Sequence, residues 1–479
     1  MYLGLLEGCA RSDVDFLLQI TQFQVTFDRR QETVDIAIAS LALPALATLA
    51  ADPLASLIDI AYLGHLGSLQ LASVGVALSI FGTITKLLNI PLLSVTTNVV
   101  ATAVGSDADD KDAQIGLAAS TSLLIAILVS IAEGCALVAL AANGLSLWGV
   151  PPGSPLRGDA LDFLQIKALG APATLLLMVS QGVYRGLGDT KMPLWATVGC
   201  NLINVLLDPL LIFGLGWGVR GAAIATVAAE GAAAAWLIAS LGRKYSLSLA
   251  GRSAMASLPS FLGPTGLLAL RTVAISGTFA LATSLAARSD LAHAAAHQIC
   301  IQLWLASSLL ADSLAVAAQT LLAQGLAADE LGQVRKIAER TLQLGVGLGL
   351  SLGILLAVTS GVLPQFFTSD PAVITAIGNI FPFVILSQPI NALAFVWDGV
   401  LYGAGGFEYA AKAMAVCATP AVGCMLLALL APGAPDLELG AVWLGLTVLM
   451  TMRSITIYIP WKLQRSPFDK LFRKAVNTL

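Results

Sequence analysis

The chain has 479 residues, of which 57% are hydrophobic and only 11% are charged, and its mean hydropathy is +0.84. Ordinary soluble domains carry about 25% charged residues. This composition excludes a disordered chain, a nucleic-acid-binding protein and a soluble multi-domain enzyme, because so few charges cannot cover so much apolar surface. The net charge of −4 points to no particular partner. We therefore predict an all-α, polytopic membrane protein in which the bilayer is the solvent and each spanning helix satisfies its own backbone hydrogen bonds.

Twelve apolar segments are long enough to cross a bilayer, since a spanning helix needs about 20 apolar residues. The second and eighth segments exceed one straight crossing, so we expect them to tilt, kink or protrude, with a kink at Pro91 in the second. The predicted spans are 35–64, 69–104, 112–141, 158–185, 190–214, 217–241, 259–287, 290–325, 335–362, 371–403, 407–431 and 438–461.

The distribution of Lys and Arg predicts the orientation of these spans. Eighteen of these residues, Arg185 among them, fall at the chain termini and in the even-numbered loops, whereas three fall in the odd-numbered loops. Because loops rich in Lys and Arg stay on the cytoplasmic side, both termini are expected to face the cytoplasm, or the stroma of a plastid. Residues 1–34 lack the basic start and long apolar core of a secretory signal.

Two related motifs indicate an internal repeat. Residues 182–188 read GVYRGLG and residues 399–405 read GVLYGAG, an offset of 217 that Pro172 and Pro389 share. Each motif ends a span, the fourth and the tenth, so the chain is expected to contain two six-helix units that enter the membrane from the same side. The predicted organisation is an N-terminal segment (1–34), a first lobe (35–241), a cytoplasmic loop (242–258), a second lobe (259–461) and a basic tail (462–479).

Ionisable side chains inside the spans are candidate functional residues, because a charge at the bilayer centre costs about 2.5–3.5 kcal/mol on insertion scales. Asp52 and Asp59 are seven residues apart in the first span and lie on nearly one helical face. Asn204 and Asp208 share a face of the fifth span. A carboxylate beside an amide and facing other carboxylates can hold a proton or a small cation, so these four residues are candidate cation-coupling residues. The alternative is that each Asp caps a helix or pairs with a buried Lys.

The second half of the chain contains further buried charges. Asp312 and Asp398 lie in the eighth and tenth spans, and Arg271 lies in the seventh. Lys86, in the middle of the second span, needs either a carboxylate partner or an anionic ligand. We take these four as candidate substrate-binding residues, with a structural Asp–Arg pair as the alternative. Glu133 and Glu230 are instead expected near helix ends or facing neighbouring helices.

Several other patterns have weaker functional meaning. Pro44 and Pro53 make the first helix bendable and are the candidate hinge. His293 and His297 are four residues apart, but the Glu of H-E-x-x-H and a third ligand are missing, so no metal site is predicted. The six scattered cysteines are interpreted as small core residues. Residues 186–189 match the G-x-G-D of intramembrane aspartyl proteases, but the Tyr-Asp pair that such proteases need in an earlier span is missing.

Several longer motifs carry a family resemblance. They are ADPLASLID at 51–59 running into YLGHLG at 62–67, KLLNIPLL at 86–93, QGVYRGLGDT at 181–190, residues 204–213, and QPINALAFVWDG at 388–399. Over about residues 35–461 the chain resembles the MATE family, the multidrug and toxic compound extrusion carriers. It looks closest to the DinF-like branch of plants and algae, which includes citrate effluxers and a plastid carrier of salicylate precursors.

The resemblance implies a V-shaped pair of lobes and cation-coupled antiport. It places Asp59 and Asp208, beside Asn204, as the carboxylates of the first lobe, and Asp398 as a candidate acid of the second lobe. Many prokaryotic members have Asn where this chain has Gln181. Gln181 is thus a candidate coupling residue that favours protons over sodium.

These observations together predict a secondary antiporter, not an enzyme, that exports an organic anion or a xenobiotic against inward protons by alternating access. Protonation of Asp59 or Asp208 would remove a buried charge, bend the first helix near Pro44 or Pro53, and expel the solute. The alternatives are a lipid-linked precursor flippase of the same superfamily, sodium-coupled drug efflux, and a passive channel. We expect no cofactor besides the coupling proton or sodium ion, no nucleic-acid partner, a monomer, and a location in the plasma membrane or a plastid envelope.

Overall fold

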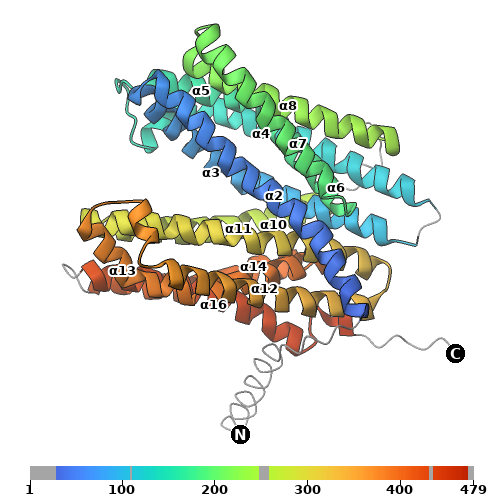
Figure 1. Cartoon of the computed structure of the whole chain (residues 1–479). Coiled ribbons are helices and arrows are strands. Elements are labelled where there is room, and N and C mark those ends of the chain that lie inside the picture. The colour runs from blue at the N-terminus through green and yellow to red at the C-terminus, as the bar shows by residue number, and fades with distance from the viewer. Residues whose placement is uncertain (1–28, 108–109, 248–257, 431–434, 473–479) are drawn as a thin grey trace, which may run out of the picture.

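The computed structural model describes residues 29–107, 110–247, 258–430 and 435–472, and the regular elements in these ranges are all helices (Figure 1). Ten helices are long and apolar enough to cross a membrane, and two bent helix pairs bring the number to twelve when each pair forms one span. The predicted all-α polytopic architecture is therefore confirmed. Much of the predicted N-terminal segment, inter-lobe loop and basic tail lies outside the described residues.

The first half of the chain forms the upper bundle in Figure 1, coloured from blue to green, which we call the first lobe. Its fifth span ends in one π-helical turn after Pro209. The elements of this lobe are α2 (Arg29–Leu66), α3 (Ser68–Gly105), α4 (Lys111–Leu147), α5 (Arg157–Leu169), α6 (Ala171–Gly186), α7 (Lys191–Pro209), η1 (Leu210–Gly214) and α8 (Gly218–Lys244).

The second half forms the lower bundle, coloured from yellow to red, which we call the second lobe. The elements of this lobe are α10 (Leu258–Ala286), α11 (Leu291–Ala327), α12 (Leu331–Thr359), η2 (Leu363–Phe366), α13 (Pro371–Leu386), α14 (Gln388–Gly403), α15 (Phe407–Leu426), η3 (Leu427–Leu430), α16 (Pro435–Lys462) and η4 (Asp469–Phe472).

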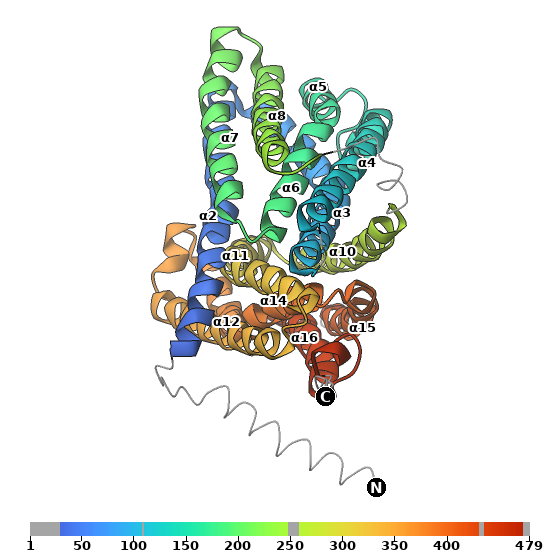
Figure 2. The same ribbon diagram turned by 90° about the vertical axis from the view of Figure 1, so that its right-hand side faces the viewer.

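The helix packing of the first lobe recurs in the second. The pairs α3–α6, α4–α6 and α7–α8 have counterparts in α11–α14, α12–α14 and α15–α16. Between the lobes, α2 packs against α11, and α10 packs against α3 (Figure 2). The first helix of each lobe therefore packs against the other lobe, as expected for two copies of one unit that enter the membrane from the same side.

The fourth and tenth spans are each built of two helices that meet at a bend, which the hydropathy of the sequence did not indicate. The axes of α5 and α6 meet at 49° around Gly170, and those of α13 and α14 meet at 47° around Ser387. Pro172 and Pro389 lie in the first turn after each bend. Proline lacks an N–H group and its ring clashes with the carbonyl four residues earlier, so a helix bends just before it.

The repeated glycine motif has a physical explanation. A Cβ atom on Gly186 would come within 2.7 Å of the Thr97 carbonyl oxygen of α3, so this glycine lets α6 lie directly on the α3 backbone. Gly403 faces Gln319 of α11 in the same way. Gly188 has φ +78°, a left-handed conformation that favours glycine after a helix C-terminus. The first two glycines of the motif therefore serve packing, and the third serves the turn.

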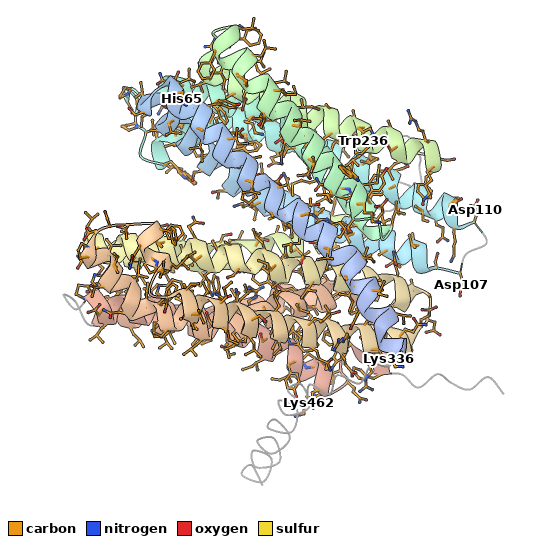
Figure 3. The ribbon with its side chains drawn as sticks, in the orientation of Figure 1. His65, Asp107, Asp110, Trp236, Lys336 and Lys462 are labelled. Atoms are coloured by element: carbon orange, nitrogen blue, oxygen red, sulfur yellow. The ribbon has the colours of Figure 1, made fainter. Side chains whose placement is uncertain are left out.

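The two ends of the molecule differ. At the end where α2 begins and α16 ends, which we call the closed side, lie Asp107, Asp110, Lys336 and Lys462, whereas His65 lies at the opposite, open side (Figure 3). The ribbons of the two lobes converge toward the closed side and diverge toward the open side (Figure 1).

Hydrogen bonds between side chains and backbone carbonyls join the lobes at the closed side. Asn98 donates to the Tyr402 oxygen at 2.7 Å, and Gln324 donates to the Gly186 oxygen at 2.8 Å. Gln319 and Thr320 make two more bonds of this kind, to the carbonyls of Ser94 and Arg185. Interhelical hydrogen bonds in membranes contribute about 0.6–2 kcal/mol each, so these bonds stabilise the contact between the two lobes at the closed side.

Candidate functional site

The first lobe brings two of the predicted carboxyl groups together. Asp59 on α2 and Asp208 on α7 lie on two helices that pack together, close enough for the charge of one carboxyl group to act on the other. Asp208 is 1% exposed, and Asp59 is half-buried. Two ionised carboxyl groups repel each other in a poorly solvated site, so a proton on one of them stabilises the pair. This arrangement is compatible with the predicted role of the pair as a proton site.

Asn204 lies one turn before Asp208 on the same face of α7 and is 5% exposed. It donates to the Thr226 hydroxyl of α8 at 3.4 Å. Thr226 was not among the predicted residues, because nothing in its local sequence distinguishes it from other threonines in apolar helices. Gln181, also predicted for this site, donates to Thr197 at 3.2 Å and makes no described bond to either carboxyl group.

Asp52 has its own partner further along the same two helices. Its carboxylate lies near the Asn201 side chain of α7. Asn201 and Asp208 are seven residues apart, as are Asp52 and Asp59, so α2 and α7 run parallel in register. Asp52 and Asp59 therefore share a face, as predicted, but they belong to two separate polar contacts.

The first lobe also contains a buried ion pair that the sequence did not reveal. The Lys167 ammonium on α5 lies 2.9 Å from the Glu230 carboxylate on α8, and the two side chains are 4% and 16% exposed. The second Glu230 oxygen accepts a bond from Thr174 on α6 at 2.5 Å. Glu230 lies near the middle of α8 and contacts the neighbouring helices α5 and α6, which is one of the two surroundings predicted for it.

A separate cavity of about 440 Å³ lies between the lobes. It is lined by helices of both lobes, and its polar wall is cationic, with Lys86, Arg185, Arg271 and Arg453 against only two carboxylates, Asp312 and Asp398. The apolar part of the wall includes the side chains of Ile90, Pro91, Leu268, Ile275, Phe279, Leu305, Val316, Phe395 and Met450.

Asp398 is held by two arginines. Arg271 on α10 donates to its Oδ2 atom at 2.5 Å, and Arg453 on α16 donates to the same atom. Arg271 also donates to the Tyr402 hydroxyl. The structural Asp–Arg pair considered from the sequence is thus present, but with a second arginine that the sequence did not assign. One carboxylate cannot balance two guanidinium groups, so this cluster keeps one positive charge toward the cavity.

Arg185 corrects one assignment of the sequence analysis. It was counted among the cytoplasmic loop residues, but it lies in the last turn of α6, is 8% exposed, and lines the cavity. Its charge interacts with Asp312 of α11 and Asp52 of α2. Lys86 also lines the cavity and is exposed. In the sequence, Arg185 stands at the end of a long apolar segment and therefore looks like a loop residue. It is buried because α6 packs onto the second lobe.

The remaining candidates have simpler surroundings. Pro44 and Pro53 lie inside the continuous helix α2, where each removes one backbone donor. Glu133 lies near the middle of α4 and is 3% exposed, so it faces neighbouring helices, which is one of the two surroundings predicted for it. Neither of its carboxyl oxygens has a hydrogen-bond partner among the described residues.

The two histidines lie on α11 without a metal-like cluster. His293 bridges Asp290 and Asp436 at 2.8 Å each at the open side, and its backbone N–H lowers the pKa of Asp290. Across residues 29–107, 110–247, 258–430 and 435–472, no group of three or more His, Cys, Asp or Glu side chains is arranged to hold a metal ion.

The fold and the cavity define a polytopic membrane transporter. The sequence model of the MatE family matches residues 44–210 and 268–429. The chain is 40% identical to Protein DETOXIFICATION 44, chloroplastic, of Arabidopsis thaliana, over 91% of this chain and 85% of that protein. It is 28% identical to the DNA damage-inducible protein F of Escherichia coli strain K12, over 89% and 92% of the two chains.

Solved structures show the same fold. The crystal structure of the Vibrio cholerae MATE transporter VcmN D35N mutant superposes with a TM-score of 0.83, covering 92% of this chain and 99% of that one at 19% identity. The chain therefore belongs to the MATE family, and its relatives include plant DETOXIFICATION proteins and DinF, as the sequence motifs predicted.

Proposed function

We propose that this MATE-family transporter is a secondary antiporter that exports an organic anion in exchange for protons. The observation that carries this proposal is the cationic cavity, in which four basic side chains face two carboxylates. An anionic solute would be stabilised there, whereas a cationic one would be repelled. The apolar wall provides contacts for the carbon skeleton of such a solute.

The neighbouring carboxyl groups of Asp59 and Asp208 support a role for protons as the coupling ion. In the proposed cycle, a proton reaches the pair from the open side and neutralises the remaining carboxylate. Loss of that charge lowers the cost of removing water from the polar faces of α2 and α7. Helix α2 then bends near Pro53 or Pro44. The solute leaves as the proton binds, and the lobes rock to open the closed side. Coupling requires only that proton and solute differ in affinity for the two states.

A second candidate function is a flippase for lipid-linked anionic precursors. Such a protein needs a strongly cationic cavity, and Arg185 and Arg453 add to the two cations that the sequence suggested. The neighbouring carboxyl groups of Asp59 and Asp208 favour the antiporter, because recognition of a phosphate-bearing lipid does not require a buried group that carries a proton. A fluorescent lipid pyrophosphate translocated without a pH gradient would favour the flippase instead.

Transport into proteoliposomes tests the proposal. Radiolabelled citrate, an aromatic carboxylate and a cationic dye are supplied to vesicles with and without an imposed pH gradient. We expect a gradient-dependent flux of at least one of the two anions and no flux of the cationic dye. Equal flux with and without the gradient would indicate a channel, and flux of the dye alone would exclude the anion carrier.

We also propose a plastid envelope as the membrane, since DETOXIFICATION 44 is named as chloroplastic. Fluorescent fusions of the full-length coding sequence are expected to outline plastids. A plasma-membrane signal would contradict this location.

A further inference from the structure

Tyr402 of α14 lies where the second-lobe ion cluster meets the cavity. It follows Asp398 by four residues, so the two side chains share a face of the helix, and both line the cavity. Arg271 of α10 donates to both residues, to the Asp398 carboxylate through Nη2 and to the Tyr402 hydroxyl through Nη1. The hydroxyl group therefore belongs to the cationic wall of the cavity, although it carries no charge at neutral pH.

The hydroxyl group of Tyr402 has an unused hydrogen-bond donor. A guanidinium group can only donate, so the Tyr402 oxygen accepts the bond from Arg271, and the hydroxyl proton takes no part in that bond. Among the described residues, including the two cavity carboxylates Asp312 and Asp398, none accepts this proton. A hydroxyl group that accepts a bond from a cation is also a stronger donor, because linked hydrogen bonds polarise one another.

The position of the Tyr402 side chain is fixed by its neighbours. The central carbon of the Arg271 guanidinium lies 5.5 Å from the centroid of the ring, and the ring stacks on that of Phe407 with the centroids 5.8 Å apart. The backbone carbonyl of Tyr402 accepts a bond from Asn98 of the first lobe at 2.7 Å. A group that is already held in place loses little conformational freedom when a ligand binds, so this donor is pre-organised for an acceptor in the cavity.

The surroundings of this donor favour an anionic acceptor. The cavity wall carries four basic side chains and two carboxylates, so its charge attracts anions in general. Coulomb attraction depends on charge and distance, so it does not distinguish two anions of equal charge and similar size. A hydrogen bond from Tyr402 does distinguish them, because its strength depends on how well the anion accepts a proton.

We propose that the Tyr402 hydroxyl donates a hydrogen bond to a carboxylate oxygen of the exported anion and thereby selects carboxylates over other anions of the same charge. This inference rests on the proposed export of an organic anion and adds the residue that determines its specificity. Arg271 supplies charge and orients the hydroxyl group, and Tyr402 supplies the bond that a weakly accepting anion cannot make.

Two anions of the same ring system and charge test the proposal. They are 2-naphthoate and 2-naphthalenesulfonate, whose sulfonate oxygens accept hydrogen bonds poorly because the group is the anion of a strong acid. Tyr402→Phe removes the hydroxyl group and keeps the ring against Arg271 and Phe407. Tyr62→Phe is the matched control, because Tyr62 packs against Phe213 and is not part of the cavity wall. Binding to the purified, detergent-solubilised full-length protein is measured by calorimetry at about pH 7, where a carboxylate is ionised.

We expect the unaltered protein and Tyr62→Phe to bind 2-naphthoate about tenfold more tightly than 2-naphthalenesulfonate. In Tyr402→Phe, the Kd of 2-naphthoate is expected to rise about tenfold and that of the sulfonate less than about twofold. Equal weakening of both anions would overturn the inference, because it would show that Tyr402 acts only by supporting Arg271. Equal affinity for the two anions in the unaltered protein, or binding of neither, would also overturn it.

Infrared difference spectroscopy of the unaltered protein keeps the test decisive if Tyr402→Phe does not fold. Tyr402 is the one tyrosine that lines the cavity in the described part of the chain. With ring-labelled tyrosine, 2-naphthoate is expected to shift a phenol C–O band that the sulfonate leaves in place, and no shift would overturn the inference. Binding requires no pH gradient. Failure of gradient-driven flux would therefore overturn the proposed function and leave the comparison of the two anions intact.

Discussion

Acidic residues of the two lobes have opposite surroundings. In the first lobe, Asp59 and Asp208 face each other, so a proton stabilises their contact. In the second lobe, Asp398 is bound by Arg271 and Arg453, and its negative charge is fully compensated. The first arrangement suits a group that gains and loses a proton, whereas the second suits a group that stays ionised.

Substitution of the coupling pair tests this difference at the residue level. Asp208→Asn and Asp59→Asn are each expected to abolish gradient-driven flux, at least about 100-fold, because neither retains two carboxyl groups that can share a proton. Both proteins should insert and melt normally, since neutralising a buried acid removes a desolvation cost. Flux in proteoliposomes and thermal melting provide the two measurements. Normal flux in both variants would place the coupling site elsewhere.

The second-lobe cluster predicts an unequal response to its substitutions. Asp398→Asn leaves two buried arginines unpaired and is expected to lose about 3–5 kcal/mol of stability. Arg271→Gln leaves Asp398 paired with Arg453, so this variant should fold and show at least about tenfold weaker anion flux through loss of one cavity charge. Thermal melting and citrate flux distinguish the two effects. A larger loss of stability in Arg271→Gln than in Asp398→Asn would contradict this assignment.

At the level of elements, the bent spans and their glycines shape both lobes. The bends around Gly170 and Ser387 have the same 217-residue offset as the glycine motifs. The first-lobe bend brings Lys167 and Thr174 from different helix axes to one Glu230 carboxylate. In a straight fourth span, Lys167 and Thr174 would lie on one helix axis at a fixed spacing. Their meeting at the Glu230 carboxylate therefore depends on the bend.

The close contact of α6 with α3 predicts a strong effect of side-chain size. Gly186→Val would push Cβ and its methyl groups into the Thr97 carbonyl and Val100, and overpacking of this kind costs about 1–3 kcal/mol. Gly199→Ala is the matched control, because a Cβ atom there meets no atom within 4 Å. We expect a lower Tm for the first variant and an unchanged or slightly higher Tm for the second. Equal melting of the two would refute the close-packing explanation.

At the level of the whole molecule, the lobes are joined on the closed side and separated on the open side. Arg340 of α12 forms a two-pronged ion pair with Asp35 of α2, at 2.6 and 2.7 Å. This contact bridges residues 305 positions apart and connects the two lobes. Alternating access requires the contact to break, because the closed side cannot open while both prongs are made.

Removal of this ion pair is expected to shift the conformational equilibrium with little change in stability. Arg340 and Asp35 are about one-third exposed, and exposed pairs contribute about 0–1 kcal/mol. Arg340→Gln should therefore leave the Tm nearly unchanged but lengthen distances between spin labels at Asp107 and Lys336, which lie on different lobes at the closed side. The charge-swapped variant Asp35→Arg/Arg340→Asp should restore the original distances. An unchanged distance distribution in Arg340→Gln would show that this pair does not restrain the lobes.

The sequence by itself determined the membrane class, the approximate span positions and the repeated motif, and it marked Asp59, Asn204 and Asp208 as candidate residues of the first-lobe site. These features are local, because hydropathy over about 20 residues defines a span and an ionisable group within it is conspicuous. Their meeting across α2, α7 and α8 follows from helix packing, which a linear pattern does not contain.

Only the tertiary structure decided which charges pair and which face the cavity. Glu230 lies 63 residues from Lys167, and Arg453 lies 55 residues from Asp398, so no sequence spacing links them. Arg185 resembles a loop residue until the second lobe covers it. Burial in a bilayer makes each such charge costly unless a partner or ligand meets it, and the partner is chosen by the contact of helices distant in the chain.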